Sequence, residues 1–350
     1  YCFINKRIKF IMAYTTIKKP SDYFNTKLYT GNGSTQTISG VGFQPDFNWT
    51  KSRTSNQSHV LTDAVRGVTK TLFTNATQAE ATLSGITAFG TDGYTLGASD
   101  LWSENSASFA SWNWLANGAG SANTAGSINS TVSVNTTSGF SIVSYTGTGA
   151  NATVGHGLGV APKMVIIKNR DSATNWLVYH ASLGNANSLV LNTTGASFSS
   201  GDWQNTTPSS SSIYLSGGDA INKSGSNQIA YCFADVQGFS KMGSYTGNGS
   251  TDGTFVYTGF KPSFILFKKT TGSAGDWQLW DNKRDPINPV EKAIHPNANG
   301  GASTDQDIDF LSNGFKIRSF EAHLNGSGVE FIYMAFAEEP LVGDNPATAR

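Results

Sequence analysis

The sharpest group of residues that could do chemistry in this sequence is the acidic run Asp305-Gln306-Asp307-Ile308-Asp309. Alternate residues of an extended segment point to the same side, so three carboxylates would face one way and could bind an oxygen-liking cation such as calcium. An EF-hand loop would need a glycine one place further on, where Phe310 stands. We favour the alternative that this run is a charged strand edge, which blocks pairing with another chain.

Two further aspartates each stand three residues before an arginine: Asp63 before Arg66, and Asp281 before Arg284. Glycoside hydrolysis needs two carboxylates at a set separation. However, the place that Asp63 and Asp281 share in a repeated pattern is taken by His180 in its middle copy. No single acidic pair is therefore defined, and we favour a structural ion pair within each loop.

Other catalytic and cofactor motifs are missing from the sequence. It contains no Gly-x-Ser-x-Gly and no phosphate-binding loop ending in Gly-Lys-Ser/Thr. The glycine-rich run 155–159 precedes an apolar segment instead of opening a helix, so we interpret it as a turn. The five histidines lie far apart, and Cys2 and Cys232 are too few for a disulfide framework. We predict no catalytic residue, no metal site and no cofactor.

The tryptophans fall into two groups. Trp176 and Trp277 recur at the same place of the repeated pattern, which indicates core residues. Trp102, Trp203 and Trp280 lie outside it, and Trp203 stands in a loop rich in Ser, Gly, Asn and Thr. An exposed indole could stack on a sugar ring or fill a subunit interface, where tryptophan is enriched. We therefore take Trp102, Trp203 and Trp280 as candidate ligand or interface residues, and favour the interface.

Composition narrows the class of protein. The 350 residues include 24 basic and 24 acidic ones, and only 14% are charged, against roughly 25% in a typical soluble domain. A nucleic-acid partner would need a basic stripe, and a membrane span roughly 18 consecutive apolar residues; the sequence offers neither. With 38 glycines and many Ser, Thr and Asn residues, the chain is typical of turn-rich β proteins.

One pattern occurs three times along the chain. A Tyr-Thr-Gly tripeptide is followed 16 or 17 residues later by a proline, and a lysine stands six residues after that proline. An apolar stretch lies between proline and lysine, and each copy closes with an aromatic segment. The copies contain Tyr29, Pro45, Lys51 and Phe109–Trp114; Tyr145, Pro162, Lys168 and Ile229–Phe233; and Tyr245, Pro262, Lys268 and Phe331–Phe336.

These repeats predict the fold. The apolar stretches after the prolines have the pattern of strands buried on both faces. Asp92-Gly93 and Asn313-Gly314 are strong hairpin signals, whereas helical periodicity is confined to short stretches such as Thr77–Leu83. We predict an all-β protein of three tandem β-sandwich, jelly-roll-like modules of about 100 residues, with an extended N-terminal arm.

The spacing of the copies places the boundaries. The expected parts are an arm at 1–23, modules at 24–118, 139–237 and 238–343, a linker at 119–138 and a tail at 344–350. Within the linker, Thr131–Val134 could form an added strand. The arm alternates basic and apolar residues, and we expect it to lie against a partner rather than to act as a targeting sequence.

Several phrases of the repeat carry a resemblance. They are residues 145–164, 243–250 and 334–342, together with the closing Ala-Thr-Ala-Arg350. These phrases resemble a repeat family of structural, tail-fibre-like proteins from tailed bacteriophages of marine bacteria. The resemblance covers nearly the whole chain from Met12, and only the extension before Met12 departs from it. It implies a component of the virion, and it brings no catalytic residues with it.

Together these observations predict a non-enzymatic virion structural protein, in the tail or a surface appendage. We expect it to assemble with itself, as a homotrimer or a multi-copy array, and with other virion proteins, without nucleic acid and without membrane insertion. The alternatives are a capsid decoration protein and a carbohydrate-binding module that contacts a host surface glycan. A polysaccharide depolymerase is the alternative with least support.

Overall fold

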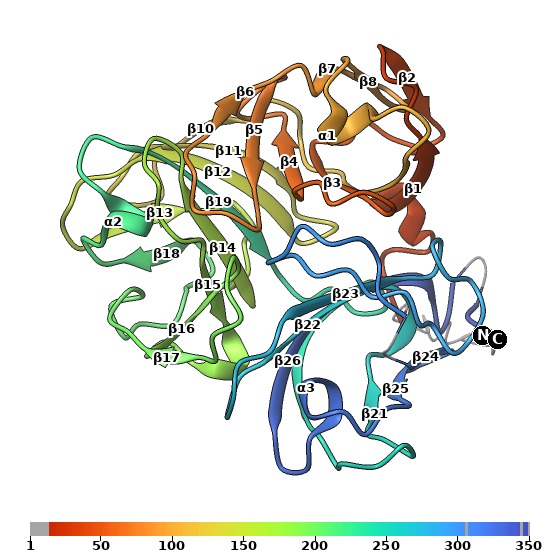
Figure 1. Cartoon of the computed structure of the whole chain (residues 1–350). Helices are drawn as coiled ribbons and strands as arrows, with labels where there is room; N and C mark the ends of the chain where they lie inside the picture. The colour runs from red at the N-terminus through yellow and green to blue at the C-terminus, as the bar shows by residue number, and fades with distance from the viewer. Residues whose placement is uncertain (1–13, 305–306, 344–345, 349–350) are drawn as a thin grey trace, which may run out of the picture.

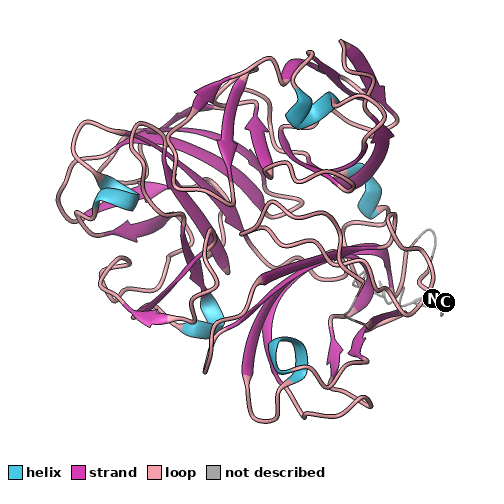
Figure 2. Cartoon of the chain, in the orientation of Figure 1, coloured by secondary structure: helices cyan, strands magenta, loops and turns pink. Residues whose placement is uncertain are grey.

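A computed structural model describes residues 14–304, 307–343 and 346–348 of the chain. The protein is nearly all β, with 42% of residues in strands and 5% in helices. Figure 2 shows strands throughout, with only short helical turns between them. The prediction of an all-β sandwich fold is confirmed.

The first unit of the fold holds two sheets. The larger has the strand order β1-β9-β3-β4-β5-β6 and the smaller the order β2-β8-β7, all antiparallel. Its elements are η1 (Pro20–Asp22), β1 (Phe24–Thr30), β2 (Gln36–Ser39), β3 (Phe47–Ser52), β4 (Val60–Asp63), β5 (Lys70–Phe73), β6 (Ala81–Thr82), β7 (Ile86–Gly90), β8 (Gly93–Leu96), α1 (Asp100–Ser103) and β9 (Ser108–Trp114).

The second unit repeats this plan with two added strands. Its larger sheet has the order β10-β11-β12-β19-β14-β15-β16-β17, and its smaller sheet pairs β13 with β18. Its elements are β10 (Ser121–Asn123), β11 (Ser130–Asn135), β12 (Phe140–Thr146), β13 (Ala152–Gly155), β14 (Met164–Asn169), β15 (Leu177–His180), η2 (Ala181–Leu183), β16 (Asn187–Val190), β17 (Phe198–Ser199), β18 (Ser212–Leu215), α2 (Asp219–Asn222) and β19 (Asn227–Phe233).

The third unit has a larger sheet of order β20-β26-β22-β23 and a smaller one of order β21-β25-β24. Its elements are β20 (Ser240–Thr246), β21 (Phe255–Tyr257), β22 (Phe260–Lys269), β23 (Trp277–Asp281), β24 (Ile308–Leu311), β25 (Gly314–Ile317), α3 (Ala322–Asn325) and β26 (Glu330–Pro340). In all three units the closing strand lies between the opening strand and the strand that begins just after the repeated proline or, in β22, contains it. Figure 1 shows the units grouped around a common centre.

The repeated tyrosine marks the same joint in each unit. Tyr29, Tyr145 and Tyr245 donate their hydroxyl groups to carbonyl oxygens of the short helices, over 2.9, 2.6 and 2.8 Å. Each bond attaches the opening strand of the larger sheet to the helix that precedes the closing strand. The tyrosine therefore recurs because a buried hydroxyl needs a partner at this position.

The hydrophobic residues form two kinds of core. Each unit has its own core between its larger and smaller sheets. The outer faces of the three larger sheets meet in a further core that all the units share. The closing strands fill the shared core with Trp112, Trp114, Tyr231, Phe233, Met334 and Phe336. Every residue of β3, β14 and β22 is buried, because these strands have a core on each side.

Two local predictions need correction. The expected linker at 119–138 contains β10 and β11, which extend the larger sheet of the second unit through β12; the added strand at Thr131–Val134 lies within β11. Thr77–Leu83, expected as a helical stretch, is a loop ending in β6. Its apolar residues Ala81 and Leu83 pack on the first unit's core, which needs no helix to bury them.

The two hairpins predicted from Asp92-Gly93 and Asn313-Gly314 are present as β7–β8 and β24–β25. At both glycines the backbone of a neighbouring strand approaches closely. A Cβ atom on Gly93 would collide with the carbonyl oxygen of Ile38, and one on Gly314 with that of Val256. Both glycines lie where the adjacent strand of the same smaller sheet comes too close for a side chain.

Part of the expected N-terminal arm lies outside the described residues, which begin at Tyr14. The described part packs on its own chain: Ile17 is buried in the shared core, and the Tyr14 hydroxyl donates to the carbonyl oxygen of Gly259 over 2.9 Å. Residues 14–17 therefore attach this segment to the third unit and to the shared core.

Candidate functional site

Asp63 ends β4 with a fully buried carboxylate. Its Oδ2 accepts a hydrogen bond from Nε of Arg66 at 2.5 Å and another from the hydroxyl of Tyr231, in the second unit, at 2.8 Å. Burial would lower the pKa of Arg66, but the charge of Asp63 raises it above its ordinary value. The predicted ion pair is confirmed, and its carboxylate also joins the first unit to the second.

Asp281 ends β23 in the same way. Its Oδ2 accepts a hydrogen bond from Nε of Arg284 at 2.5 Å, and another at 3.0 Å from the indole Nε1 of Trp112, in the first unit. The guanidinium carbon of Arg284 also lies 5.7 Å from the centre of a Trp112 ring. This second predicted ion pair is confirmed as well, and it joins the third unit to the first.

His180 ends β15 and joins the remaining pair of units. Its Nδ1 accepts the backbone N–H of Ser182 at 3.2 Å, and its Nε2 lies 3.2 Å from the carbonyl oxygen of Tyr333, in the third unit. Nε2 must therefore carry the proton and donate it. Burial lowers the pKa of His180 to about 4, so the imidazole is neutral at neutral pH.

The second unit has a histidine where the first and third units have an aspartate, and this difference has a physical reason. Strand register puts Trp112, Tyr231 and Met334 at the same place of the three closing strands. Trp112 and Tyr231 carry hydrogen-bond donors, which suit an aspartate opposite. Met334 carries none, so the residue opposite must itself donate, to a backbone carbonyl.

The three contacts form a closed ring, which we call the joint ring. Asp63 links the first unit to the second, His180 links the second to the third, and Asp281 links the third to the first.

The in-register tryptophans reinforce the joints. Trp176 donates its indole N–H to the carbonyl oxygen of Phe73 at 2.8 Å, and Trp277 donates to that of Val190 at 2.9 Å. Both bonds cross from one unit to the preceding one. The prediction that these tryptophans are core residues is confirmed, and the core in question is the shared one.

His59 occupies the corresponding place in the first unit: its backbone N–H donates to the side chain of Asn75, as those of Trp176 and Trp277 donate to asparagine side chains in their own units. Its Nδ1 accepts the indole N–H of Trp49 at 3.0 Å, and its ring stacks on Trp112 with centroids 6.4 Å apart. Burial, followed by the charge of Lys51, keeps the pKa of His59 well below its ordinary value. This histidine is a packed core residue.

The three repeated lysines are also buried. Lys51 and Lys168 each donate to the carbonyl oxygen of the last residue of their own strand and to one in the loop that follows, at distances of 2.7–3.1 Å. Lys268 donates to Gly275 at 2.7 Å and, across a joint, to Thr194 at 3.0 Å. Burial lowers the pKa of each lysine to about 8. An amine with such a pKa could act as a nucleophile, but these amines are covered and already bonded to carbonyls.

The three candidate tryptophans do not form a site. Trp102, Trp203 and Trp280 are at most 1% exposed, each in the core of a different unit. Trp203 packs edge-on against Tyr179 and donates to Oγ of Ser188 at 2.9 Å. The expectation of an exposed Trp203 is wrong. Its polar loop turns the indole inward, where it fills part of the hydrophobic core of the second unit.

The acidic run lies partly outside the described residues, which omit Asp305 and Gln306. Of its remaining carboxylates, Asp309 is bonded to Nε of Arg318 at 2.5 Å. No group of three His, Cys, Asp or Glu side chains that could hold a metal occurs among residues 14–304, 307–343 and 346–348. In the same part of the chain, no helix is long and apolar enough to cross a membrane.

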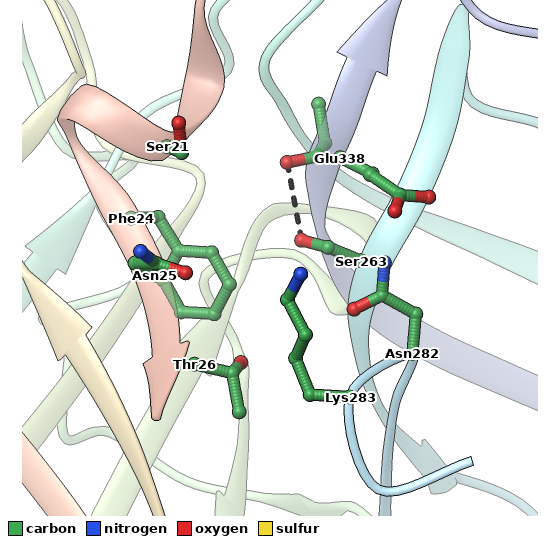
Figure 3. A pocket seen from close by; sticks show the side chains of 9 residues that line it. Ser21, Phe24, Asn25, Thr26, Ser263, Asn282, Lys283 and Glu338 are labelled. Atoms are coloured by element: carbon green, nitrogen blue, oxygen red, sulfur yellow. Dashed lines mark hydrogen bonds between the residues drawn. The ribbon is translucent and has the colours of Figure 1, made fainter. Parts of the chain in front are cut away.

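A small cavity lies at the joint between the first and third units (Figure 3). Asn25 and Thr26 line it from β1, and Asn282 and Lys283 from the loop after β23. Thr26 Oγ1 and Asn282 Oδ1 are buried there without a hydrogen-bond partner among the described residues. The volume of about 40 Å³ suits a few water molecules rather than a substrate.

The functional residues that the sequence reasoning missed are the partners across the joints, Trp112, Tyr231 and Tyr333. The available signal was the shared place of Trp112 and Tyr231 in their closing strands; Tyr333, which takes part only through its backbone carbonyl, stands one residue before that place in the third copy.

No curated protein matches the chain. Residues 19–340, which span all three units, match the model of the family described as "Domain of unknown function (DUF7483)", and the chain belongs to that family.

Proposed function

We propose that this protein is a structural, non-enzymatic component of a bacteriophage particle, placed in its tail or in a surface appendage. The observation that carries the structural role is the joint ring. The side chains of the types that act as general acids or bases at this repeated place are Asp63, His180 and Asp281. Each is buried in a contact between units. The assignment to a bacteriophage rests on the sequence phrases that resemble tail-fibre-like proteins.

The contacts of the joint ring support a mechanical role, in which the three units keep fixed positions. The ring's three contacts between units are buried hydrogen bonds, and leaving a buried polar group without its partner costs roughly 1–3 kcal/mol, so the units resist sliding past one another. Hydrogen bonds of indole and imidazole groups fix the relative orientation of the units at the joints. The shared aromatic core stabilises the same arrangement by burying apolar surface. A rigid block made of three small sandwiches suits an appendage that must keep its shape. We expect several copies per particle, in contact with one another and with other virion proteins.

The test is to locate the protein in the bacteriophage that encodes it. Antibodies raised against the purified chain are applied to intact particles for immunogold electron microscopy, and mass spectrometry gives its amount per particle. Gold on the tail or an appendage supports the proposal. Gold over the whole head would make the protein a decoration protein, and absence from washed particles would overturn any virion role. Release of reducing ends from host polysaccharide by the purified chain would overturn the non-enzymatic part.

A further inference from the structure

The smaller sheet of the third unit carries two exposed aromatic residues on one edge strand. Phe255 and Tyr257 on β21 are 43% and 50% exposed, whereas Val256 between them is buried in the unit's core. Residues two apart in a strand point to the same face and lie about 7 Å apart. The two rings therefore stand side by side on the outer face of this sheet, at the end labelled β21 in Figure 1.

The fold does not require aromatic residues at these places. Strand register equates Phe255 and Tyr257 with Thr37 and Ser39 in the first unit. The first unit builds the same smaller sheet with two small polar residues facing outward. Exposed aromatic rings are unfavourable in water, so their presence in one unit alone points to a contact that this unit makes.

A groove of about 460 Å³ opens beside Tyr257. This volume lies within the range of sites for small ligands, roughly 300–1,000 Å³. Tyr14 and Tyr257 line the groove together with the polar side chains of Asp235, Gln237 and Lys241. The groove thus combines aromatic surface with both donors and acceptors of hydrogen bonds.

The backbone edge of β21 is partly closed. Lys241 donates from Nζ to the carbonyl oxygen of Tyr257 at 2.9 Å, and the same Nζ lies 5.5 Å from the centre of the tyrosine ring. Lys241 belongs to β20 of the larger sheet, and its charged side chain, bonded to this carbonyl oxygen, opposes the addition of a further strand beside β21. The ligand is therefore one that side chains bind, and not a peptide that extends the sheet.

Sugars match this combination. The C–H bonds on the face of a pyranose ring pack against an aromatic ring, while the hydroxyl groups on its rim exchange hydrogen bonds with carboxylate, amide and ammonium groups. Two aromatic rings in a row suit a chain of sugars better than a single one. We infer that Phe255, Tyr257 and the groove lined by Asp235, Gln237 and Lys241 form a binding site for an oligosaccharide chain.

This inference deepens the proposed function, on which its biological meaning rests, because an appendage with such a site could bind a host surface glycan. The two can fail separately. Binding is measured on the purified chain, whereas the place in the particle is measured by antibody labelling.

The test uses an array of bacterial surface oligosaccharides, followed by titration calorimetry with the bound sugar. The key variant carries F255T and Y257S, which are the residues of the first unit, so its sheet should form as that unit's does. We expect at least a tenfold loss of affinity in this variant. Its circular dichroism spectrum and urea midpoint should match those of the unchanged chain.

Phe198→Ser is the matched control, because Phe198 is 42% exposed on a strand of the second unit. It should bind the sugar as the unchanged chain does. Failure of the unchanged chain to bind any glycan overturns the inference, as does full binding by F255T/Y257S. A change from oligomer to monomer in F255T/Y257S, measured by sedimentation, would make the surface a contact between copies and overturn it too.

Discussion

The indole Nε1 of Trp112 donates a hydrogen bond of 3.0 Å to Oδ2 of Asp281, although 169 residues separate them in the chain. Trp112 belongs to the last strand of the first unit, and Asp281 to the third unit. The first and third units are not consecutive, so this contact closes the joint ring. Because Asp281 also neutralises Arg284, the same carboxylate holds a loop and a joint.

Asp281→Ala should destabilise the protein by about 3–5 kcal/mol, because it leaves the Arg284 guanidinium buried without its carboxylate. Urea unfolding followed by tryptophan fluorescence measures this loss. Asp22→Ala is the control: the Lys19–Asp22 pair is exposed, and exposed pairs contribute at most about 1 kcal/mol. Equal losses in the two variants would contradict the role given to the joint ring.

Acid should weaken the joint between the second and third units through His180. Its pKa is about 4 in the folded chain and 6.5 as an ordinary value. Stability from the neutral imidazole is therefore complete above pH 6.5 and is lost as the pH falls from 6.5 through 4, by up to about 3 kcal/mol. His180→Gln keeps a donor and cannot titrate. Urea midpoints between pH 7 and 4 should fall less steeply for it than for the unchanged chain, and parallel curves would contradict the assignment.

Placing an aspartate at position 180 should not reproduce the other two joints. Leu183 stands where Arg66 and Arg284 stand in the outer units, so the carboxylate of His180→Asp would be buried opposite a carbonyl without a cation. We expect a loss of about 3–5 kcal/mol.

Adding Leu183→Arg to His180→Asp should recover at least about 1 kcal/mol of that loss, measured as the coupling in a double-mutant cycle. Leu183→Arg alone supplies the control. Additive effects would show that position 183 does not face position 180 as the outer units suggest.

Trp203→Ala should cost about 3–5 kcal/mol of stability, because it empties the core of the second unit and leaves Ser188 without its indole partner. Phe198→Ala, at an exposed aromatic nearby in the chain, should cost less than about 1 kcal/mol. Both are compared by thermal and urea unfolding. A Trp203→Ala protein as stable as the unchanged chain would contradict the placement of the indole.

Local sequence patterns predicted much of this architecture and little of how its parts meet. Tyr29, Tyr145 and Tyr245 revealed the repeat, and the spacing of Asp63 and Arg66 revealed a loop ion pair, since both depend on neighbours in the chain. A continuously apolar strand such as β14 shows that both faces are buried. It does not show that one face meets other units, because periodicity carries no information on what lies opposite.

Trp203 shows the same limit in the candidate site. The sequence around a lone indole among serines and glycines is the same whether the indole is exposed or buried. The path of the loop determines which of the two occurs. The Phe255–Tyr257 pair was hidden for the opposite reason: alternation of aromatic and apolar residues also describes a strand buried on both faces. Exposure became evident only when the first unit provided the same sheet for comparison.

The shared core has a consequence for how this chain is made. During synthesis the first unit emerges well before the third, so the parts of Trp112 and Trp114 that pack on Phe264 and Phe336 remain uncovered until those strands have been translated. A chain halted after the second unit would expose this aromatic face and tend to aggregate. Only a chain that includes the third unit can bury this aromatic surface, so an incomplete chain differs from a complete one in its exposed hydrophobic area.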